Sequence, residues 1–460
     1  MQNDCYGLAM TAASREAAGY YDEALRAFLG FRSDTGAHLK QALAADAGLF
    51  MGHCIRGYFF KLLSLPTLEQ KALEAADKAR QLAKVVSARE CEHLAALEAW
   101  CAGDMAACTV RWEGILVEYP RDLLALRLAH FCHFYTGDSI AMRDSLARVM
   151  PAWEAGEPSA GFVHGMYAFG LEECGDYTAA RAMGEGAVAA NPGDIWAVHA
   201  VAHVHEMEGR SGDGIAWLKA TEDGWSGCNN FAYHVWWHRA LFHFERQQYD
   251  EVLSLYDAHI RADPSEDYLD ISNGVAMLWR LENAGVAVGA GWEELADNAE
   301  KRTADHLLAF ADMHFSMALA AAGRNAALDD MIASMRATNA GARTTQQQVL
   351  AEVGVALASA VRAYYAGDFD LALALLMPLR YRVRAIGGSH AQRDLFAQML
   401  IAAALKYEKF ALARAFLHER TALKPNSAVA WDLLAQALVG EGKTKDASLA
   451  RHRAERLLAA

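Results

Sequence analysis

The sequence predicts an all-α protein built from repeated helices. Eight prolines are spread over 460 residues, while alanine recurs along the whole chain, and these two residues are the weakest and the strongest helix formers. A hydrophobic content of 53% supplies enough apolar surface for a large core. At about 150 residues per domain, the length allows either about three globular domains or one long repeat array. The spacing of turn residues distinguishes these two alternatives.

Three prolines and two tyrosines recur at one interval. Pro120, Pro192 and Pro264 lie 72 residues apart, and so do Tyr177 and Tyr249, each of which precedes a proline by 15 residues. Half of this interval is close to the period of about 34 residues that is typical of tetratricopeptide (TPR) helix–turn–helix units. The spacing therefore predicts one α-solenoid of stacked helix pairs rather than separate domains.

Glycine-aspartate turns and the C-terminal segment agree with this period. Gly-Asp dipeptides separate segments of helical length and begin at Gly103, Gly137, Gly175 and Gly367. Residues 423–458 match a TPR unit, with large and small residues in the expected order at Pro425, Trp431, Leu434, Ala435, Leu438, Ala447 and Ala454. Small residues are needed where two helices cross closely.

We therefore expect a single TPR-like domain over residues 1–460, in which antiparallel helix pairs coil into one right-handed superhelix. The clearest repeats are expected at 86–264 and 405–460, and irregular repeats at 265–400.

Four short segments carry a resemblance to a known family. They are HAVAHVHEM (199–207), MRDSLARV (142–149), AQRDLF (391–396) and LKPNS (423–427). With them, the chain resembles the tetratricopeptide repeat protein 38 family nearly from end to end. The resemblance implies a TPR-like α-solenoid and assigns no biochemical activity.

Histidines gather in the middle of the chain. Six of the 18 fall between positions 199 and 243, namely His199, His203, His205, His234, His238 and His243. His199 and His203 are four residues apart, as are His234 and His238, so each pair lies on one helical face. The TPR register places Trp196, His199, His203 and Glu206 at groove-facing positions. In an earlier repeat, such positions hold Arg127, Phe131 and Phe134. Further titratable groups are His130 and His133, and Asp312 with His314.

The histidine pairs permit two kinds of chemistry. Imidazoles four residues apart on a helix can ligate one metal ion, so His199, His203, His234 and His238 are the candidate ligands of a divalent metal. The same four histidines, with Glu206, are the candidate catalytic residues, since imidazoles transfer protons near neutral pH. The alternative is that each ring packs between helices and forms a hydrogen bond locally.

Aromatic and basic residues complete the candidate site. We expect Trp196, His199, His203, Trp237 and Arg393 to contact a ligand, because small-molecule sites combine aromatic walls with a few polar groups. Arg393 belongs to an arginine-rich segment around the turn Gly387-Gly388-Ser389, whose amides suit an anion at a helix start. The alternative for this segment is an exposed helix end whose arginines pair with the surplus acids.

Three classes of function follow from these residues. The first is a TPR-like protein whose interior, lined by histidine and aromatic residues, binds a small polar molecule or a short peptide. The second is an enzyme that uses the four histidines for acid–base or metal-assisted chemistry on a small metabolite. The third is a scaffold for protein–protein interaction. The sequence leaves open whether a reaction is catalysed and whether the protein forms a homo-oligomer.

Charge and cysteine usage set the expected partners and compartment. With 57 acidic and 43 basic residues the net charge is −14, which predicts no nucleic-acid partner and no adsorption to an anionic membrane. The first 20 residues lack a basic segment followed by an apolar one, so no secretory signal is expected. Eight scattered cysteines without a C-x-x-C pair predict reduced thiols and a cytoplasmic protein.

Overall fold

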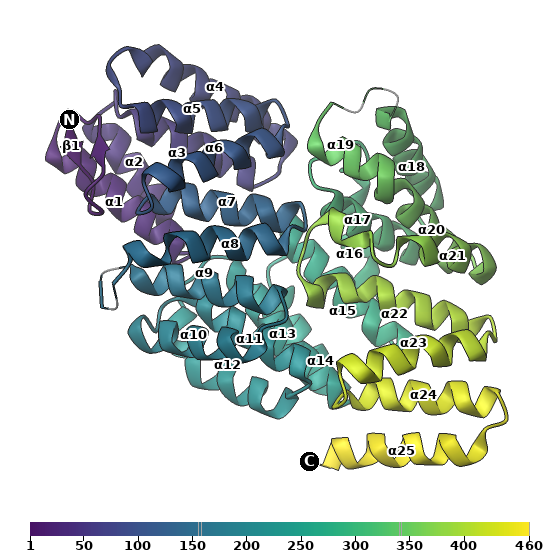
Figure 1. The fold of residues 1–460 in the computed structure, drawn as a ribbon. Helices are drawn as coiled ribbons and strands as arrows, with labels where there is room; N and C mark the ends of the chain where they lie inside the picture. Colours follow the sequence, from purple (N-terminus) through teal and green to yellow (C-terminus); the bar gives the residue numbers. More distant parts are fainter. Residues whose placement is uncertain (155, 158, 340, 342, 460) are drawn as a thin grey trace. The chain divides into compact units, whose positions relative to one another are not determined.

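The computed structural model describes residues 1–154, 156–157, 159–339, 341 and 343–459. Within these residues the chain is almost entirely helical (Figure 1), and its strands are β1 (Gln2–Asn3) and β2 (Ala9–Met10), which pair in antiparallel fashion. The prediction of an all-α, TPR-like α-solenoid is confirmed. In the described part of the chain, no helix is both long enough and apolar enough to cross a bilayer.

The chain divides into two compact units. Unit 1 comprises Met1–Val201, Asp223–Ala232 and Gly341–Gln348, and unit 2 comprises Ala202–Glu222, Tyr233–Ala340 and Val349–Ala460. The division passes through α11 (Ile195–Glu208), α12 (Ser211–Trp225), α13 (Phe231–Glu245) and α19 (Thr345–Val349). The expectation of one array over the whole chain stays a prediction.

Unit 1 is a series of helices that pack on their neighbours in sequence. They are α1 (Arg15–Leu29), α2 (Thr35–Ala45), α3 (Phe50–Leu62), α4 (Pro66–Leu82), α5 (Ala88–Cys101), α6 (Met105–Glu118), α7 (Leu123–Tyr135), α8 (Ser139–Val149), α9 (Ala160–Glu173) and α10 (Tyr177–Ala190). Pairs such as α3 with α4 and α9 with α10 pack along their lengths. Short 3₁₀ turns follow α4 (Ala83–Val85) and α8 (Met150–Ala152).

Unit 2 contains the C-terminal helices. They are α14 (Tyr249–Leu255), α15 (Tyr268–Asn283), α16 (Gly291–Glu300), α17 (Ala309–Ala321), α18 (Asn325–Asn339), α20 (Val355–Tyr365), α21 (Phe369–Leu376), α22 (His390–Lys406), α23 (Phe410–Leu423), α24 (Ala428–Gly440) and α25 (Thr444–Ala459). A π-helical turn extends α14 (Tyr256–Ile260) and another precedes α20 (Leu350–Gly354), and 3₁₀ turns at Met377–Leu379 and Val383–Ile386 lead toward α22. Besides sequential pairs such as α20 with α21, helix α15 also packs on α22.

The helix boundaries explain the 72-residue interval. Pro120, Pro192 and Pro264 fall in the loops before α7, α11 and α15, while Tyr177 and Tyr249 are the first residues of α10 and α14. One interval therefore spans two helix pairs. Proline suits these loops because it lacks the N–H that a helix interior requires.

The Gly-Asp turns both end one helix and begin the next. Gly137 and Gly175 have φ values of 68° and 84°, a left-handed conformation that glycine adopts without steric cost. The aspartate that follows caps the next helix, since Asp138 accepts a hydrogen bond from the backbone N–H of Ala141 at 3.0 Å. The same cap is found at Asp104, Asp176 and Asp368.

The C-terminal helix pair confirms the TPR register. Leu434, Ala435 and Leu438 of α24 and Ala447 and Ala454 of α25 are all buried. The two helices pack along their lengths, and the small alanine side chains allow their backbones to approach.

We expect Asp138→Ala to lower the free energy of unfolding by about 1 kcal/mol, because the Ala141 N–H loses its acceptor. Asp138 is exposed, so the substitution leaves the core intact. Urea denaturation of Asp138→Asn is the matched control, since asparagine retains a capping oxygen. Equal losses in the two variants would contradict a capping role.

Candidate functional site

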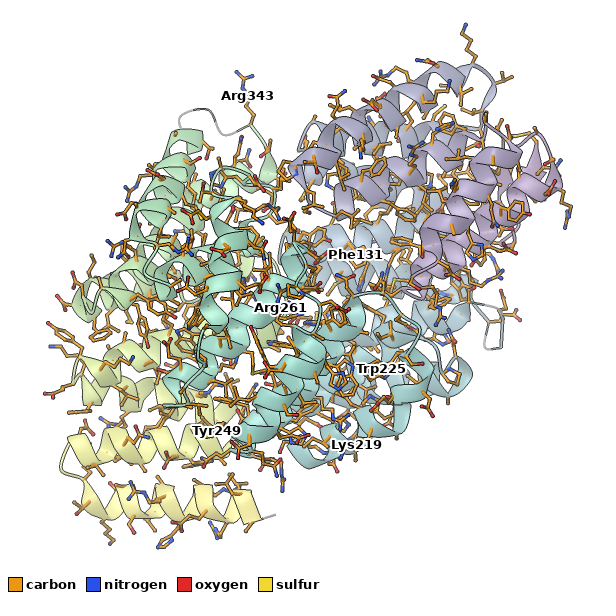
Figure 2. The ribbon with its side chains drawn as sticks, turned by 180° about the vertical axis from the view of Figure 1, so that it is seen from behind. Phe131, Lys219, Trp225, Tyr249, Arg261 and Arg343 are labelled. Atoms are coloured by element: carbon orange, nitrogen blue, oxygen red, sulfur yellow. The ribbon has the colours of Figure 1, made fainter. Side chains whose placement is uncertain are left out.

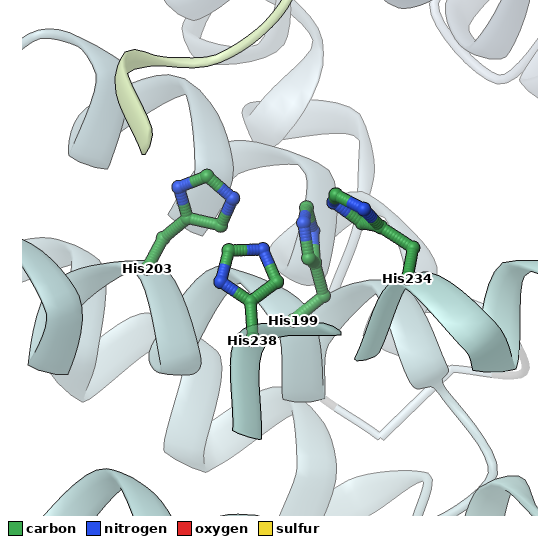
Figure 3. Close-up of side chains that lie close together, drawn as sticks. All are labelled: His199, His203, His234 and His238. Carbon is green, nitrogen blue, oxygen red and sulfur yellow. The ribbon is translucent and has the colours of Figure 1, made fainter. Parts of the chain in front are cut away.

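Three of the predicted histidines meet inside unit 2. His203 comes from α11, and His234 and His238 come from α13. The His203 and His238 ring centroids are 4.4 Å apart, and those of His234 and His238 are 4.8 Å apart. Each ring offers one nitrogen, and these nitrogens lie within 4.8 Å of one another. Figure 3 shows the three rings with His199, which α11 carries one turn before His203. We call His203, His234 and His238 the histidine cluster.

Burial keeps the histidine cluster uncharged. It lowers the pKa of His234 to about 4, against the opposing effect of a hydrogen bond with Asn273. For His203 and His238, burial again dominates, and neighbouring imidazoles together with the positive charge of Lys424 lower the pKa further. Neutral imidazoles retain a lone pair on one ring nitrogen, which can accept a hydrogen bond or ligate a metal.

Asn273 of α15 orients one ring of the histidine cluster. Its Oδ1 lies 2.8 Å from His234 Nδ1, and both side chains are buried. An amide oxygen can only accept, so His234 Nδ1 carries the proton and Nε2 bears the lone pair. A partner of this kind fixes the tautomer of a functional histidine.

Trp237 and Arg393 lie in the same unit as the histidine cluster. The Trp237 indole is buried and stacks on the His234 ring at 5.2 Å, with the Arg280 guanidinium 5.5 Å from its centroid. Arg393, on α22, donates to the carbonyl oxygen of Gly388, and its charge contributes to the lowered pKa of His203. Two of the other arginines in that segment form ion pairs, Arg380 with Glu419 and Arg382 with Glu352.

An ion-pair network adjoins the histidine cluster. Lys424 Nζ donates to Glu206 Oε1 at 2.9 Å, and both residues are more than nine-tenths buried. Arg420 donates two hydrogen bonds to Asp394, at 2.5 and 2.8 Å. Glu206, expected to serve in catalysis, is therefore the partner of an ammonium group. We call these four residues the ion-pair network.

The ion-pair network fixes the charge of its members. Burial by itself raises the pKa of Asp394, but the charges of Arg420, Lys424 and Arg280 outweigh it and hold that pKa well below its usual range. Burial likewise opposes the charge of Lys424, yet Glu206 and Asp394 raise its pKa above the ordinary value. Asp394 and Lys424 therefore stay ionised at neutral pH, each beside a partner of opposite charge.

Trp196 and His199 belong to unit 1. The His199 ring stacks on Phe169 at 5.4 Å and contacts Phe231 at 5.2 Å, while Trp196 lies 5.0 Å from Phe169. Both side chains, which the TPR register places at groove-facing positions, are buried. His205, the third histidine of α11, is also buried, and burial lowers its pKa.

The sequence does not predict the buried groups that come from distant helices. Asn273, Arg280, Lys424 and Asp394 lie 35 to 221 residues away from the histidines in the sequence, and no local spacing relates them to the cluster. Lys424 lies in LKPNS (423–427), one of the four segments that carry the family resemblance, but the sequence assigns it no function. A charged residue at a position that the helical period buries was the signal available in the sequence.

No protein-family model matches the sequence. Among solved structures, the chain is similar to a human IFIT1 dimer with m7Gppp-AAAA, at 13% identity and a TM-score of 0.39, over 99% of this chain and 97% of that one. It is also similar to Naa15/Naa10 bound to HypK-THB, at 13% identity and a TM-score of 0.27, over 95% and 62% of the respective chains. A third similarity is to the P58(IPK) TPR domain, at 12% identity and a TM-score of 0.23, over 81% and 99%.

These similarities correct one expectation. The prediction that nucleic acid is excluded as a partner is wrong, because IFIT1, which is similar along nearly the whole chain, is seen with m7Gppp-AAAA. Net charge by itself does not exclude a nucleic-acid partner. A value of −14 averages over 460 residues, whereas binding depends on the potential at one surface.

We expect Asp394→Asn to lower the free energy of unfolding of unit 2 by about 3 kcal/mol, because Arg420 would keep a largely buried charge without its carboxylate. Asp329→Asn is the control, since Asp329 pairs with Arg362 on the exposed surface, where such pairs contribute about 0–1 kcal/mol. Chemical denaturation followed by circular dichroism measures both. A loss at Asp394 no larger than that at Asp329 would show that the network is not a stabilising constraint.

A second expectation concerns pH. His314 of α17 is buried and hydrogen-bonded to the Phe310 carbonyl at 2.8 Å, and burial lowers its pKa to about 4. Below about pH 6.5 the unfolded chain therefore binds a proton at this imidazole that the folded chain does not bind. The contribution of His314 to the free energy of unfolding is full above pH 6.5 and decreases as the pH falls toward 4. Relative to His314→Asn, the wild type should lose about 1.4 kcal/mol per pH unit in this window. Parallel pH profiles of the two proteins would contradict a buried neutral imidazole.

Proposed function

We propose that this TPR-like protein binds a small polar molecule bearing an anionic group, at the histidine cluster of unit 2. The observation that carries the proposal is the meeting of three buried, uncharged imidazoles beside cationic side chains. Arg280, Lys424 and Arg393 all act electrostatically on these rings. Neutral imidazoles supply N–H donors without the cost of burying further charge.

The surroundings favour a compact ligand. Trp237 provides a flat apolar wall beside His234, and small-molecule sites commonly pair such walls with a few polar groups. Arg393 would complement the anionic group, as a guanidinium does for carboxylate or phosphate. On this assignment His203, His234, Trp237 and Arg393 contact the ligand, and the ion-pair network holds their helices in place.

A divalent metal is the second candidate, and one observation favours it. The ring nitrogens of His203, His234 and His238 lie within 4.8 Å of one another, and Asn273 Oδ1 lies 2.8 Å from the other nitrogen-bearing side of one of these rings, at His234 Nδ1. Three histidines suit zinc in a catalytic site, where the fourth position holds water. His199, one turn before His203 on α11, is the fourth imidazole of the predicted ligand set. A metal there would extend the function to metal-assisted hydrolysis.

We further propose membership of the tetratricopeptide repeat protein 38 family as the finer classification of the fold. The support is the set of four segments, including HAVAHVHEM (199–207), which contains the cluster residue His203, and LKPNS (423–427), which contains its neighbour Lys424. Membership adds no activity to the proposal.

The test combines elemental analysis with ligand screening. Purified wild type, His203→Ala and the exposed control His452→Ala are measured for zinc, iron and manganese, and their melting temperatures are recorded with phosphate, glycerol 3-phosphate and succinate. A ligand that binds the folded state raises the melting temperature. We expect a shift of several degrees in the wild type and in His452→Ala, and none in His203→Ala.

The outcomes separate the candidates. One equivalent of metal in the wild type that is lost in His203→Ala supports the metal site. Identical responses in all three proteins to every anion would overturn the binding proposal. Recovery of a single stoichiometric protein partner in pull-downs, without any ligand response, would favour a scaffold instead.

A further inference from the structure

Unit 1 buries a guanidinium that has no acidic partner. Arg127 of α7 is 1% exposed, and in the described part of the chain no carboxylate lies within ion-pair distance of it. Asp194 is the acid that acts on it most strongly. Its Oδ1 accepts the backbone N–H groups of Trp196 and Ala197, both at 3.1 Å, and its Oδ2 is buried without a hydrogen-bond partner among the described residues. Burying a charge without a counter-ion is costly.

The protonation states of Arg127 and Asp194 leave the buried positive charge incompletely compensated. Burial lowers the pKa of Arg127 to about 9, so the guanidinium still carries its charge at pH 7. Burial also raises the pKa of Asp194 to about 7, so this carboxyl is only partly ionised at neutral pH. Unit 1 therefore retains a buried positive charge that its own acid compensates incompletely.

Unpaired donors gather around this charge. Among the described residues, Arg127 Nε and Nη2 have no hydrogen-bond partner, and neither do both ring nitrogens of His130 or the Trp196 Nε1. All three side chains are more than nine-tenths buried. Nε and Nη2 form one edge of the guanidinium, where two parallel N–H groups match the two oxygens of a carboxylate. His130 lies one turn after Arg127 and 5.4 Å from the Trp196 ring.

Aromatic rings enclose the same guanidinium. Its central carbon lies 4.6 Å from the Phe31 ring, 4.6 Å from Phe131 and 4.5 Å from Trp196. Phe231 extends this wall by stacking on Phe31 at 4.3 Å. Figure 2 labels Phe131 on its helix. A ligand that pairs with the charge would therefore place an apolar body against aromatic surface.

Phe31 is the part of this wall that reaches solvent. It is half-buried, whereas Phe131 and Trp196 are buried. Phe31 lies in the turn between α1 and α2 with a φ of 53°, a strained conformation for a bulky residue. Strain of this kind concentrates at ligand-binding positions.

Contacts with aromatic rings do not satisfy Arg127 by themselves. A ring attracts the flat face of a guanidinium and leaves the N–H groups on its edge unpaired. The edge donors of Arg127, its incomplete neutralisation and the one unpaired N–H of the neutral His130 imidazole all call for an acceptor that carries negative charge.

We propose that Arg127, His130 and Trp196 form a binding site for a monocarboxylate with an apolar body, lined by Phe31 and Phe131. A single guanidinium beside a neutral imidazole balances one negative charge. Phosphate carries more than one negative charge at neutral pH and would leave an excess. The residues of this site all belong to unit 1.

Calorimetry and melting curves on the full chain test this site. Protein dialysed against chloride buffer is titrated with acetate, benzoate and octanoate, with benzamide as the uncharged match to benzoate and with inorganic phosphate as the other anion. The variants are Arg127→Met, Arg127→Lys, His203→Ala and the exposed control Arg111→Gln. We expect benzoate or octanoate to bind the wild type, His203→Ala and Arg111→Gln with equal affinity.

The two Arg127 variants distinguish a ligand-binding role of this arginine from a packing role. A lysine keeps the charge but loses the two-pronged edge, so Arg127→Lys should bind about 100-fold more weakly, and Arg127→Met should not respond. Without ligand, Arg127→Met should melt at or above the wild-type temperature, since it removes an uncompensated buried charge. A marked loss of ligand-free stability in Arg127→Met would assign the arginine to packing alone.

Three further results would overturn the proposal. They are no response of the wild type to any carboxylate, equal binding of benzamide and benzoate, and stronger binding of phosphate than of benzoate. Loss of benzoate binding in His203→Ala would also count against a site built from Arg127, His130 and Trp196, whereas a failure of the phosphate and succinate screen tests only the histidine cluster.

Discussion

The ion pairs between Lys424 and Glu206 and between Arg420 and Asp394 are the constraint on which unit 2 depends. Glu206 and Lys424 are 218 residues apart in the sequence, whereas in a simple repeat array each unit contacts only its neighbours. Buried charges tolerate little displacement, because each would lose its partner without gaining water. The network therefore fixes the end of α11 against the loop between α23 and α24, and with it the position of His203.

Both units place polar groups where an ordinary helical repeat would place leucine or alanine, but they balance them differently. In unit 2, Asp394 and Glu206 neutralise Arg420 and Lys424, and the uncharged histidine cluster sits beside balanced pairs. In unit 1, Arg127 has aromatic neighbours and no carboxylate within ion-pair distance among the described residues. Buried ion pairs with balanced charge hold helices together, whereas a buried charge without a counter-ion points to a ligand.

Much of the fold could be predicted because its signals are local. The Gly-Asp turns specify a left-handed glycine and a helix cap within four residues, as at Gly137 and Asp138, and the proline interval counts two helix pairs. The i, i+4 histidine pairs also follow from one helix each. The contact between the His203 and His238 rings, in contrast, depends on how α11 and α13 pack. Asn273 and Lys424 come from other parts of the chain, and no local pattern relates them to these histidines.

The sequence by itself determined the all-α class, the TPR-like repeat and the turns between helices, because helical period and turn chemistry act over a few residues. Only the tertiary structure decided which charges are paired. Glu206, read from the sequence as a catalytic candidate, has an ammonium partner, and Arg127, read as one groove residue among several, has no carboxylate within ion-pair distance in the described chain. Electrostatic balance depends on distances between residues far apart in the chain, and those distances exist only once the helices have packed.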